Sequence, residues 1–229
     1  MLVSAAVCPH PPSLVPDVSR RAWDQLREVR DASLQAVRRL AGDEPDLLVT
    51  VGAGGATRRW GPDAGGTLHD FGVDAGFGGP TPGLPLSLTI AAYLLRAGEI
   101  GCAAHQELAP DAPADACSRI GADLAGLAER VSLLVMADGS ARRTRQSPGP
   151  YDERAAAFDA EVWRSLGSPD PAALLAIDPD LAGGLWVAGR PGWQVLAGAL
   201  LASTGNWSGE LIHTSAPLGV GYVVARLHT

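Results

Sequence analysis

Short apolar runs alternate with amphipathic segments along the chain, and this alternation predicts an α/β fold. Four of the runs are typical of strands buried on both faces: Leu2–Val7, Asp46–Val51, Ile100–His105 and Val131–Met136. From Trp23 to Leu40 apolar residues recur at helical spacing, so we expect a helix capped by Asp17 or Ser19 and closed by Gly42. The order strand, helix, strand implies a right-handed parallel crossover.

The rest of the chain continues the same alternation. Residues 61–83 are rich in Gly and Pro and predict a long loop, with one short strand candidate at Thr67–Val73. We expect helices over Leu84–Arg96, Ala114–Arg130, Tyr151–Leu166 and Trp193–Ser203, short helices after Asp170 and Asp178, and closing strands at Glu210–His213 and Val220–Leu227. No change of composition marks a linker, so we expect one α/β domain over residues 1–229. Its central sheet is expected to be mainly parallel or mixed, with helices on both faces.

Composition narrows the classes of function. The chain has 229 residues, 46% of them hydrophobic, and a net charge of −7, which argues against a basic nucleic-acid-binding face. All 18 basic residues are Arg, so a Walker-A lysine and Schiff-base chemistry are excluded. Three cysteines without a CxxC pair fit a reduced cytoplasm, and no apolar run approaches the roughly 18 residues of a membrane span. The start of the chain has no basic segment before its apolar run, so we expect no signal peptide.

Polar and glycine residues follow three of the predicted buried strands. Because the carboxyl ends of parallel strands meet at one edge of a sheet, we expect these polar and glycine residues to surround one ligand cleft. The predicted pocket residues are His10, Gly52, Gly54, Asp138, Ser140 and Arg142. Arg142, with Arg143 and Arg145, belongs to a polar loop whose guanidinium groups are suited to gripping a carboxylate.

Other readings of these segments are weaker. The turn at Gly52 has the spacing GxGG rather than GxGxxG, which favours a tight turn over a dinucleotide site. Ser140 is not part of a GxSxG elbow. No HxH or HxxxH pair marks a metal site, although His10 and His105 are both expected at strand ends, where Cys8 and Glu107 also fall.

The ordered set of segments resembles the class III extradiol ring-cleavage dioxygenases of the LigB type, and more closely their small single-domain members related to the Memo proteins. The matching stretches are AAVCPHPPSLVP, ADGSARRT, YDERAAAFDAEV, DPAALLAIDPDL, AGRPGWQVLAGAL and APLGVGYVVA. They follow one another in the family's order over nearly the whole chain. The resemblance implies an α/β fold and, in catalytic members, Fe(II) held by two His and one Glu, with open positions for a catechol and O₂.

Only one of the four functional positions implied by the resemblance is retained. His10 corresponds to the first iron ligand. The second ligand would fall in Val51–Gly54, which contains no His, and the Glu ligand would fall in Val187–Gly189, which reads Val-Ala-Gly. Ala141 replaces the catalytic His. Loss of a general base alone typically costs about 10²–10⁴-fold in rate.

We therefore expect a homologue that has lost ring cleavage and binds a small molecule or a protein, with no cofactor. Two alternatives remain open. In the first alternative, a metal site for Fe(II) or Zn has been relocated to His69 or His105, with Glu107 or Asp138, and the protein is an oxidoreductase. In the second, the chain is a structural subunit of a homo-oligomer.

Overall fold

A mixed sheet forms the centre of the computed structural model, which describes residues 1–18 and 20–229, without the side chains of 20–23. The strands are β1 (Leu2–Cys8), β2 (Leu47–Ala53), β3 (Arg58–Trp60), β4 (Ala64–Thr67), β5 (Gly76–Gly78), β6 (Thr81–Pro82), β7 (Ala104–Leu108), β8 (Val131–Met136), β9 (Ser208–Ser215) and β10 (Tyr222–His228). Seven of them form the central sheet in the order β3-β7-β2-β8-β1-β10-β9, and the other three form a small sheet, β5-β4-β6. The predicted α/β class with a mixed sheet is confirmed.

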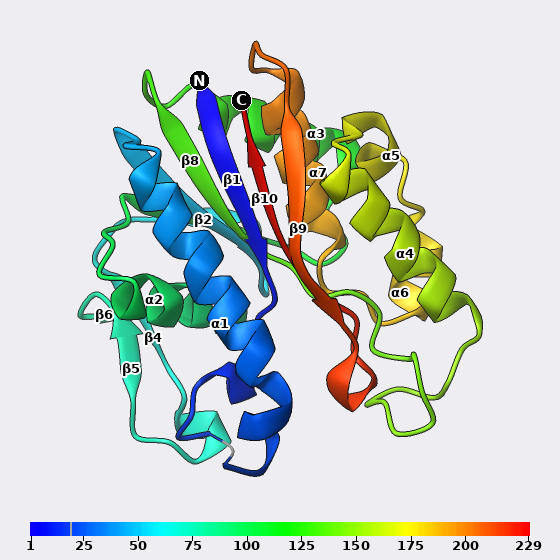
Figure 1. Ribbon diagram of the computed structural model, residues 1–229. Helices are drawn as coiled ribbons and strands as arrows, with labels where there is room; N and C mark the ends of the chain where they lie inside the picture. The colour runs from blue at the N-terminus through cyan, green and yellow to red at the C-terminus, as the bar shows by residue number, and fades with distance from the viewer. Residues whose placement is uncertain (19) are drawn as a thin grey trace.

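Helices cover both faces of the central sheet, as predicted (Figure 1). The α-helices are α1 (Arg20–Gly42), α2 (Leu86–Ala97), α3 (Ala114–Ala125), α4 (Arg154–Gly167), α5 (Pro171–Leu175), α6 (Pro179–Gly184) and α7 (Arg190–Leu201). Three short 3₁₀ turns are η1 (Pro12–Leu14), η2 (His69–Phe71) and η3 (Pro217–Gly219). Among the described residues no helix combines the length and the apolar character needed to cross a membrane.

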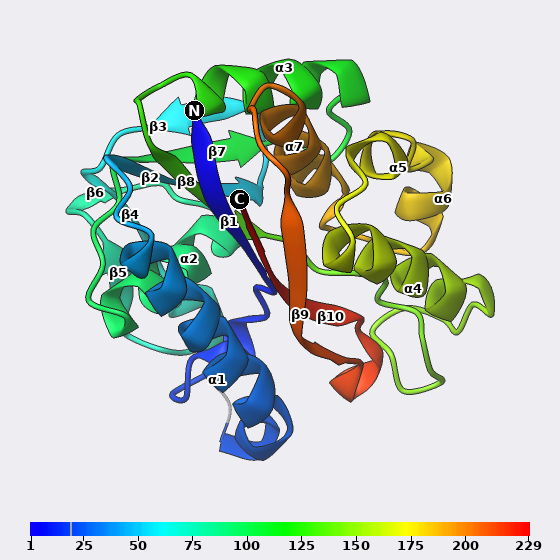
Figure 2. The same cartoon turned by 45° about the horizontal axis from the view of Figure 1, so that its top comes forward.

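The two faces of the sheet carry separate apolar cores. One core contains buried side chains of α1 and α2, such as Val37 and Ile90. The other contains side chains of α3, α4, α5 and α7 and includes the fully buried Trp193. Figure 2 shows α1 and α2 on the side of the sheet opposite to α3 and α7. Alternate residues of β1, β2, β8 and β10 enter opposite cores, which explains why these strands are mainly apolar on both faces.

Strand direction brings three chain segments together at one edge of the sheet. β1 runs parallel to β8, with Cys8 opposite Met136, so both strands end at this edge. β10 runs antiparallel to β1, with Val7 opposite Ala225, so Tyr222 begins β10 at the same edge. The loops that follow β1 and β8 therefore lie beside the turn that precedes β10.

Several element boundaries differ from the sequence-based predictions. The third buried strand spans Ala104–Leu108 rather than Ile100–His105, because the Ile100 amide closes the end of α2 on the Leu95 carbonyl. Within the predicted strand Thr67–Val73 only Thr67 is in a strand, as the last residue of β4, and His69–Phe71 form a 3₁₀ turn that ends at Gly72, whose φ is 77°.

The ends of some helices also differ from the sequence-based predictions. α3 stops at Ala125, before the predicted Arg130, and α7 begins at Arg190, because a Pro at the first turn suits a helix start. The cap candidate Ser19 lies outside the described residues, as does the side chain of Trp23.

Candidate ligand-binding site

His10 and Asp138 lie together at the carboxyl ends of β1 and β8. The His10 backbone N–H donates to Asp138 Oδ1 at 2.8 Å, and the ring atom Nδ1 lies 3.6 Å from the same oxygen. Nδ1 is buried and has no hydrogen-bond partner among the described residues. His10 is 8% exposed, because the prolines that follow β1 hold its loop against the sheet edge.

Backbone hydrogen bonds fix the segments around this pair. The Ala137 amide donates to the Cys8 carbonyl, and the Gly189 amide donates to the Asp138 carbonyl, both at 2.8 Å. Gly139 and Gly221 join the loop after β8 to the turn before β10, since the Gly139 amide donates to the Gly221 carbonyl at 2.8 Å. A side chain on Gly221 would meet the Asp159 carboxylate, so glycine permits this close approach.

A cavity of about 380 Å³ opens beside His10 and Asp138. Its lining is mainly apolar and comes from six parts of the chain: His10, Pro11, Pro12, Ser13, Leu86, Asp138, Gly139, Ala141, Pro148, Trp186, Ala188, Leu218, Val220 and Tyr222. An apolar pocket with a few convergent polar groups is the usual form of a small-molecule site.

Burial shapes the electrostatics of the cavity. It raises the pKa of the Asp138 carboxyl above its usual range, against the lowering effects of the His10 charge and of the His10 amide hydrogen bond. It also raises the pKa of Tyr222 far above its ordinary value, and the Asp138 charge acts in the same direction. The cavity is therefore a desolvated environment in which a charge interacts strongly.

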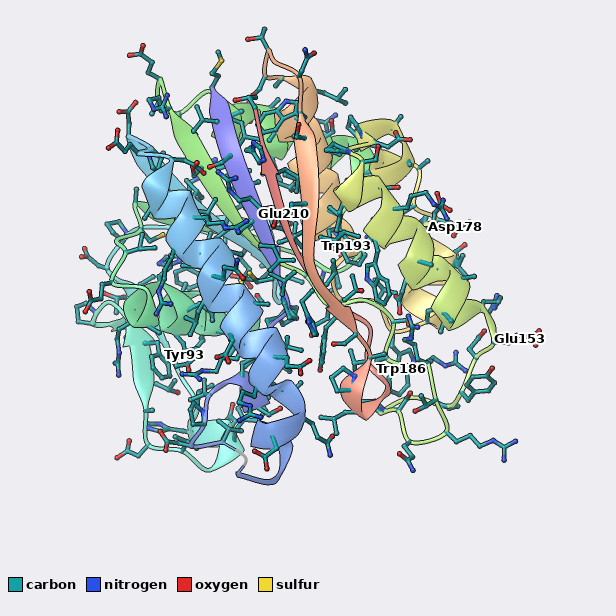
Figure 3. All side chains as sticks on the ribbon, in the orientation of Figure 1. Tyr93, Glu153, Asp178, Trp186, Trp193 and Glu210 are labelled. Carbon is teal, nitrogen blue, oxygen red and sulfur yellow. The ribbon has the colours of Figure 1, made fainter. Side chains whose placement is uncertain are left out.

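Two exposed apolar side chains at the cavity stand on left-handed backbone. Trp186 has a φ of 58° and Leu218 a φ of 59°, and they are 53% and 41% exposed. Figure 3 shows Trp186 beside the η3 turn that carries Leu218. Non-glycine residues rarely adopt this conformation. At Trp186 it ends α6, because the Trp186 and Val187 amides donate to the Gly183 and Ala182 carbonyls at 3.1 and 2.9 Å. The fold thus holds two apolar groups outward at the rim.

Ser140 and Arg142, which were expected in the pocket, have structural roles instead. Ser140 is fully buried and donates to Asp159, from N to Oδ1 at 2.8 Å and from Oγ to Oδ2 at 2.7 Å. Arg143 completes this cluster, with Nη1 2.8 Å from Asp159 Oδ2. Arg142 donates to the carbonyls of Pro150 and Gly184 and does not line the cavity.

Gly52 and Gly54 also lie away from this cavity, contrary to expectation. A side chain on Gly52 would meet Ser87, and one on Gly54 would meet the Glu107 carboxylate. Glu107 is 1% exposed and accepts hydrogen bonds from the Ala56 amide, Arg58 Nε and Trp60 Nε1, at 3.1, 2.7 and 2.9 Å. These glycines therefore give space to the Ser87 side chain of α2 and the Glu107 side chain of β7.

The remaining histidines do not join His10. His105 is the second residue of β7 rather than its end, and its Nδ1 forms a 2.7 Å hydrogen bond with Thr50 Oγ1. Cys102 Sγ lies 3.9 Å from that nitrogen. His69 is in the exposed η2 turn, with Nε2 2.8 Å from Asp74.

The residues around His10 do not fit a facial-triad iron site. Such a site needs two His and one carboxylate, and the described residues of the lining supply one His, His10, and one carboxyl group, Asp138. In the part of the chain that the structure describes, no group of three His, Cys, Asp or Glu side chains is placed to hold a metal ion. Cys8 is buried in the core, where burial raises its pKa to about 12.

Sequence reasoning missed the residues that close the cavity, chiefly Trp186, Leu218 and Tyr222. The only signal for them was indirect. Ala141 and Ala188 occupy stretches to which the family resemblance assigns catalytic and ligand positions, and both line the cavity with His10. If these stretches line one pocket, residues next to them in the sequence, such as Trp186, are candidates for the lining too.

Comparison with known proteins supports the fold alone. No protein-family model matches the sequence, and no curated protein matches it significantly. Among solved structures, the chain is similar to an uncharacterised protein, JW3007, from Escherichia coli K12, at 17% identity and a TM-score of 0.53. The similarity covers 99% of this chain and 100% of the other, so the whole α/β fold is shared.

Proposed function

We propose that this protein binds a small molecule in the cavity between His10 and Tyr222 and does not cleave it. The observation that carries the proposal is the cavity itself, a volume of about 380 Å³ with apolar walls that converges on the buried His10–Asp138 pair. Volumes of about 300–1,000 Å³ are typical of small-molecule sites.

We also propose that the protein derives from an extradiol dioxygenase of the LigB type whose iron site has been lost. Three of the four stretches to which the resemblance assigns functional positions, at His10, Ala141 and Ala188, supply residues to one cavity. Two of these three are alanine, which neither ligates a metal nor moves a proton. The fourth stretch, around Gly52, contacts Ser87 and Glu107 instead. No observation on the described residues favours a relocated metal site or a purely structural subunit.

We expect the protein to act in a reducing compartment such as the cytoplasm. Cys8, Cys102 and Cys117 are all free thiols, and two of them are buried. Disulfides are rare where thiols are kept reduced, which agrees with this arrangement.

The test is a fragment screen of the full chain by amide NMR, with a cavity-filling variant. Small apolar probes are expected to shift the amide signals of His10, Asp138 and Trp186 together. Ala188→Phe fills the cavity and should abolish these shifts, because Ala188 is part of the lining. Ala156→Phe is the matched control, since Ala156 is exposed on α4, and it should leave them intact.

Two results would contradict the proposal. One is a screen in which no probe shifts the signals around His10. The other is binding that survives Ala188→Phe unchanged, which would place the ligand elsewhere.

A further inference from the structure

The charge of the cavity lining selects among ligands. We propose that the cavity takes a small organic cation, an ammonium or amidinium group on an apolar body, with Asp138 as its counter-ion. This inference rests on the proposed function, because it names the class of ligand that the same cavity accepts.

Asp138 is the only carboxyl group among the described residues of the lining, and no arginine accompanies it. The nearby arginines are committed elsewhere, since Arg142 donates to the Pro150 and Gly184 carbonyls and Arg143 pairs with Asp159. The one basic side chain in the described lining is His10, and its Nδ1 already lies 3.6 Å from Asp138 Oδ1. An anionic ligand would therefore have to approach the Asp138 carboxylate, whereas a cationic ligand would place its charge against Asp138 Oδ2.

The Asp138 carboxylate can accept further hydrogen bonds. Its Oδ1 accepts from the His10 amide, and among the described residues Oδ2 accepts from no protein donor. Its side chain is 16% exposed, so one face remains open to the cavity. An ionised carboxylate offers about four lone-pair sites, enough to accept two further N–H groups from a ligand.

The rest of the lining suits the body of such a ligand. Trp186 and Leu218 stand at the rim on left-handed backbone, and Leu86 and Val220 complete the apolar wall. The face of a tryptophan attracts cations within about 6 Å, and most strongly where water is excluded. The apolar rim and the single carboxyl group therefore favour the same ligand: an apolar group with one positive charge.

Three probes of matched shape test the proposal at neutral pH: benzylammonium, benzyl alcohol and benzoate. Titration of the full chain by amide NMR should give benzylammonium at least about tenfold tighter binding than benzyl alcohol, because hydrogen bonds to a charged group are the stronger kind. Benzoate should bind most weakly. Asp138→Asn keeps an acceptor for the His10 amide but removes the charge. It should reduce benzylammonium affinity about tenfold and leave benzyl alcohol unchanged.

Asp74→Asn is the matched control, because it makes the same substitution on an exposed residue and should change nothing. Equal or weaker binding of benzylammonium than of benzyl alcohol overturns the inference, and so does a preference that survives Asp138→Asn. In both cases cavity binding by the neutral or anionic probe leaves the proposed function standing. If none of the three probes binds, the inference fails, and the fragment screen decides the proposed function by itself.

Discussion

Asp159 anchors the loop after β8, next to the cavity, and a single substitution tests how much its contacts stabilise the fold. Its carboxylate is 1% exposed and accepts from the Ser140 amide, the Ser140 hydroxyl and Arg143. Asp159→Ala leaves the half-buried Arg143 guanidinium without its carboxylate, and the buried Ser140 hydroxyl with only a 3.5 Å contact to the Ala155 carbonyl. We expect it to lower the free energy of unfolding by about 3–5 kcal/mol, measured by chemical denaturation. Glu161→Ala, exposed on the same helix, should stay within about 0.5 kcal/mol of the wild type, and equal losses would contradict this role.

The contribution of Glu107 to the free energy of unfolding is expected to depend on pH. Burial raises its pKa, but hydrogen bonds from Arg58, Trp60 and Ala56 outweigh burial, so the net pKa is lowered. A carboxyl with a lowered folded-state pKa stabilises the fold above its unfolded-state pKa and loses that contribution as the pH falls through the folded value. At neutral pH Glu107→Gln should therefore cost about 1–2 kcal/mol in unfolding free energy.

The difference between this variant and the wild type should begin to shrink near the ordinary pKa of 4.5 and vanish only once the pH is below the lowered folded-state pKa. Denaturant titrations at several pH values measure the difference. A difference that is constant with pH would show that the charge of Glu107 contributes nothing.

At the scale of elements, glycines set the contact between α3 and α7. A side chain on Gly198 would meet the Ser118 backbone, and one on Gly121 would meet the Val195 carbonyl. Gly198→Ala forces the helices apart, and we expect a loss of about 1–3 kcal/mol, although alanine is the better helix former. Gly183→Ala is the control, because nothing lies within 4 Å of its added carbon, and it should be neutral or stabilising. Thermal unfolding of both variants checks the prediction, and a stabilised Gly198→Ala would contradict it.

Helices and strands could be predicted where burial requires an apolar pattern in the sequence. Their boundaries could not be predicted where contacts with distant parts of the chain determine them. β1 and β8 are short and apolar except for Ser4 and Ser132, so their positions follow from pattern alone. β7 was misplaced by a few residues because its sequence, AHQEL, carries buried polar groups that pair with Thr50, Arg58 and Trp60. Periodicity contains no information about such partners.

At the scale of the molecule, topology explains which half of the site could be predicted. His10 and Asp138 follow buried parallel strands, so sequence order places them at one edge. Tyr222 and Leu218 reach that edge only because β10 pairs antiparallel with β1, and Trp186 reaches it through a left-handed backbone that its residue type does not indicate. Gly52 and Gly54 lie at the end of a parallel strand too, but β8 separates β2 from β1.

The central claim is that the cavity at His10 is a binding site without the iron chemistry that the family resemblance implies. Calorimetric titration of Fe(II) into the anaerobic full chain, wild type against His10→Ala, tests it most directly. The structure offers His10 and Asp138 where three ligands are needed, so we predict no stoichiometric binding and no difference between the two proteins. Binding of one Fe(II) per chain that His10→Ala abolishes would contradict the account.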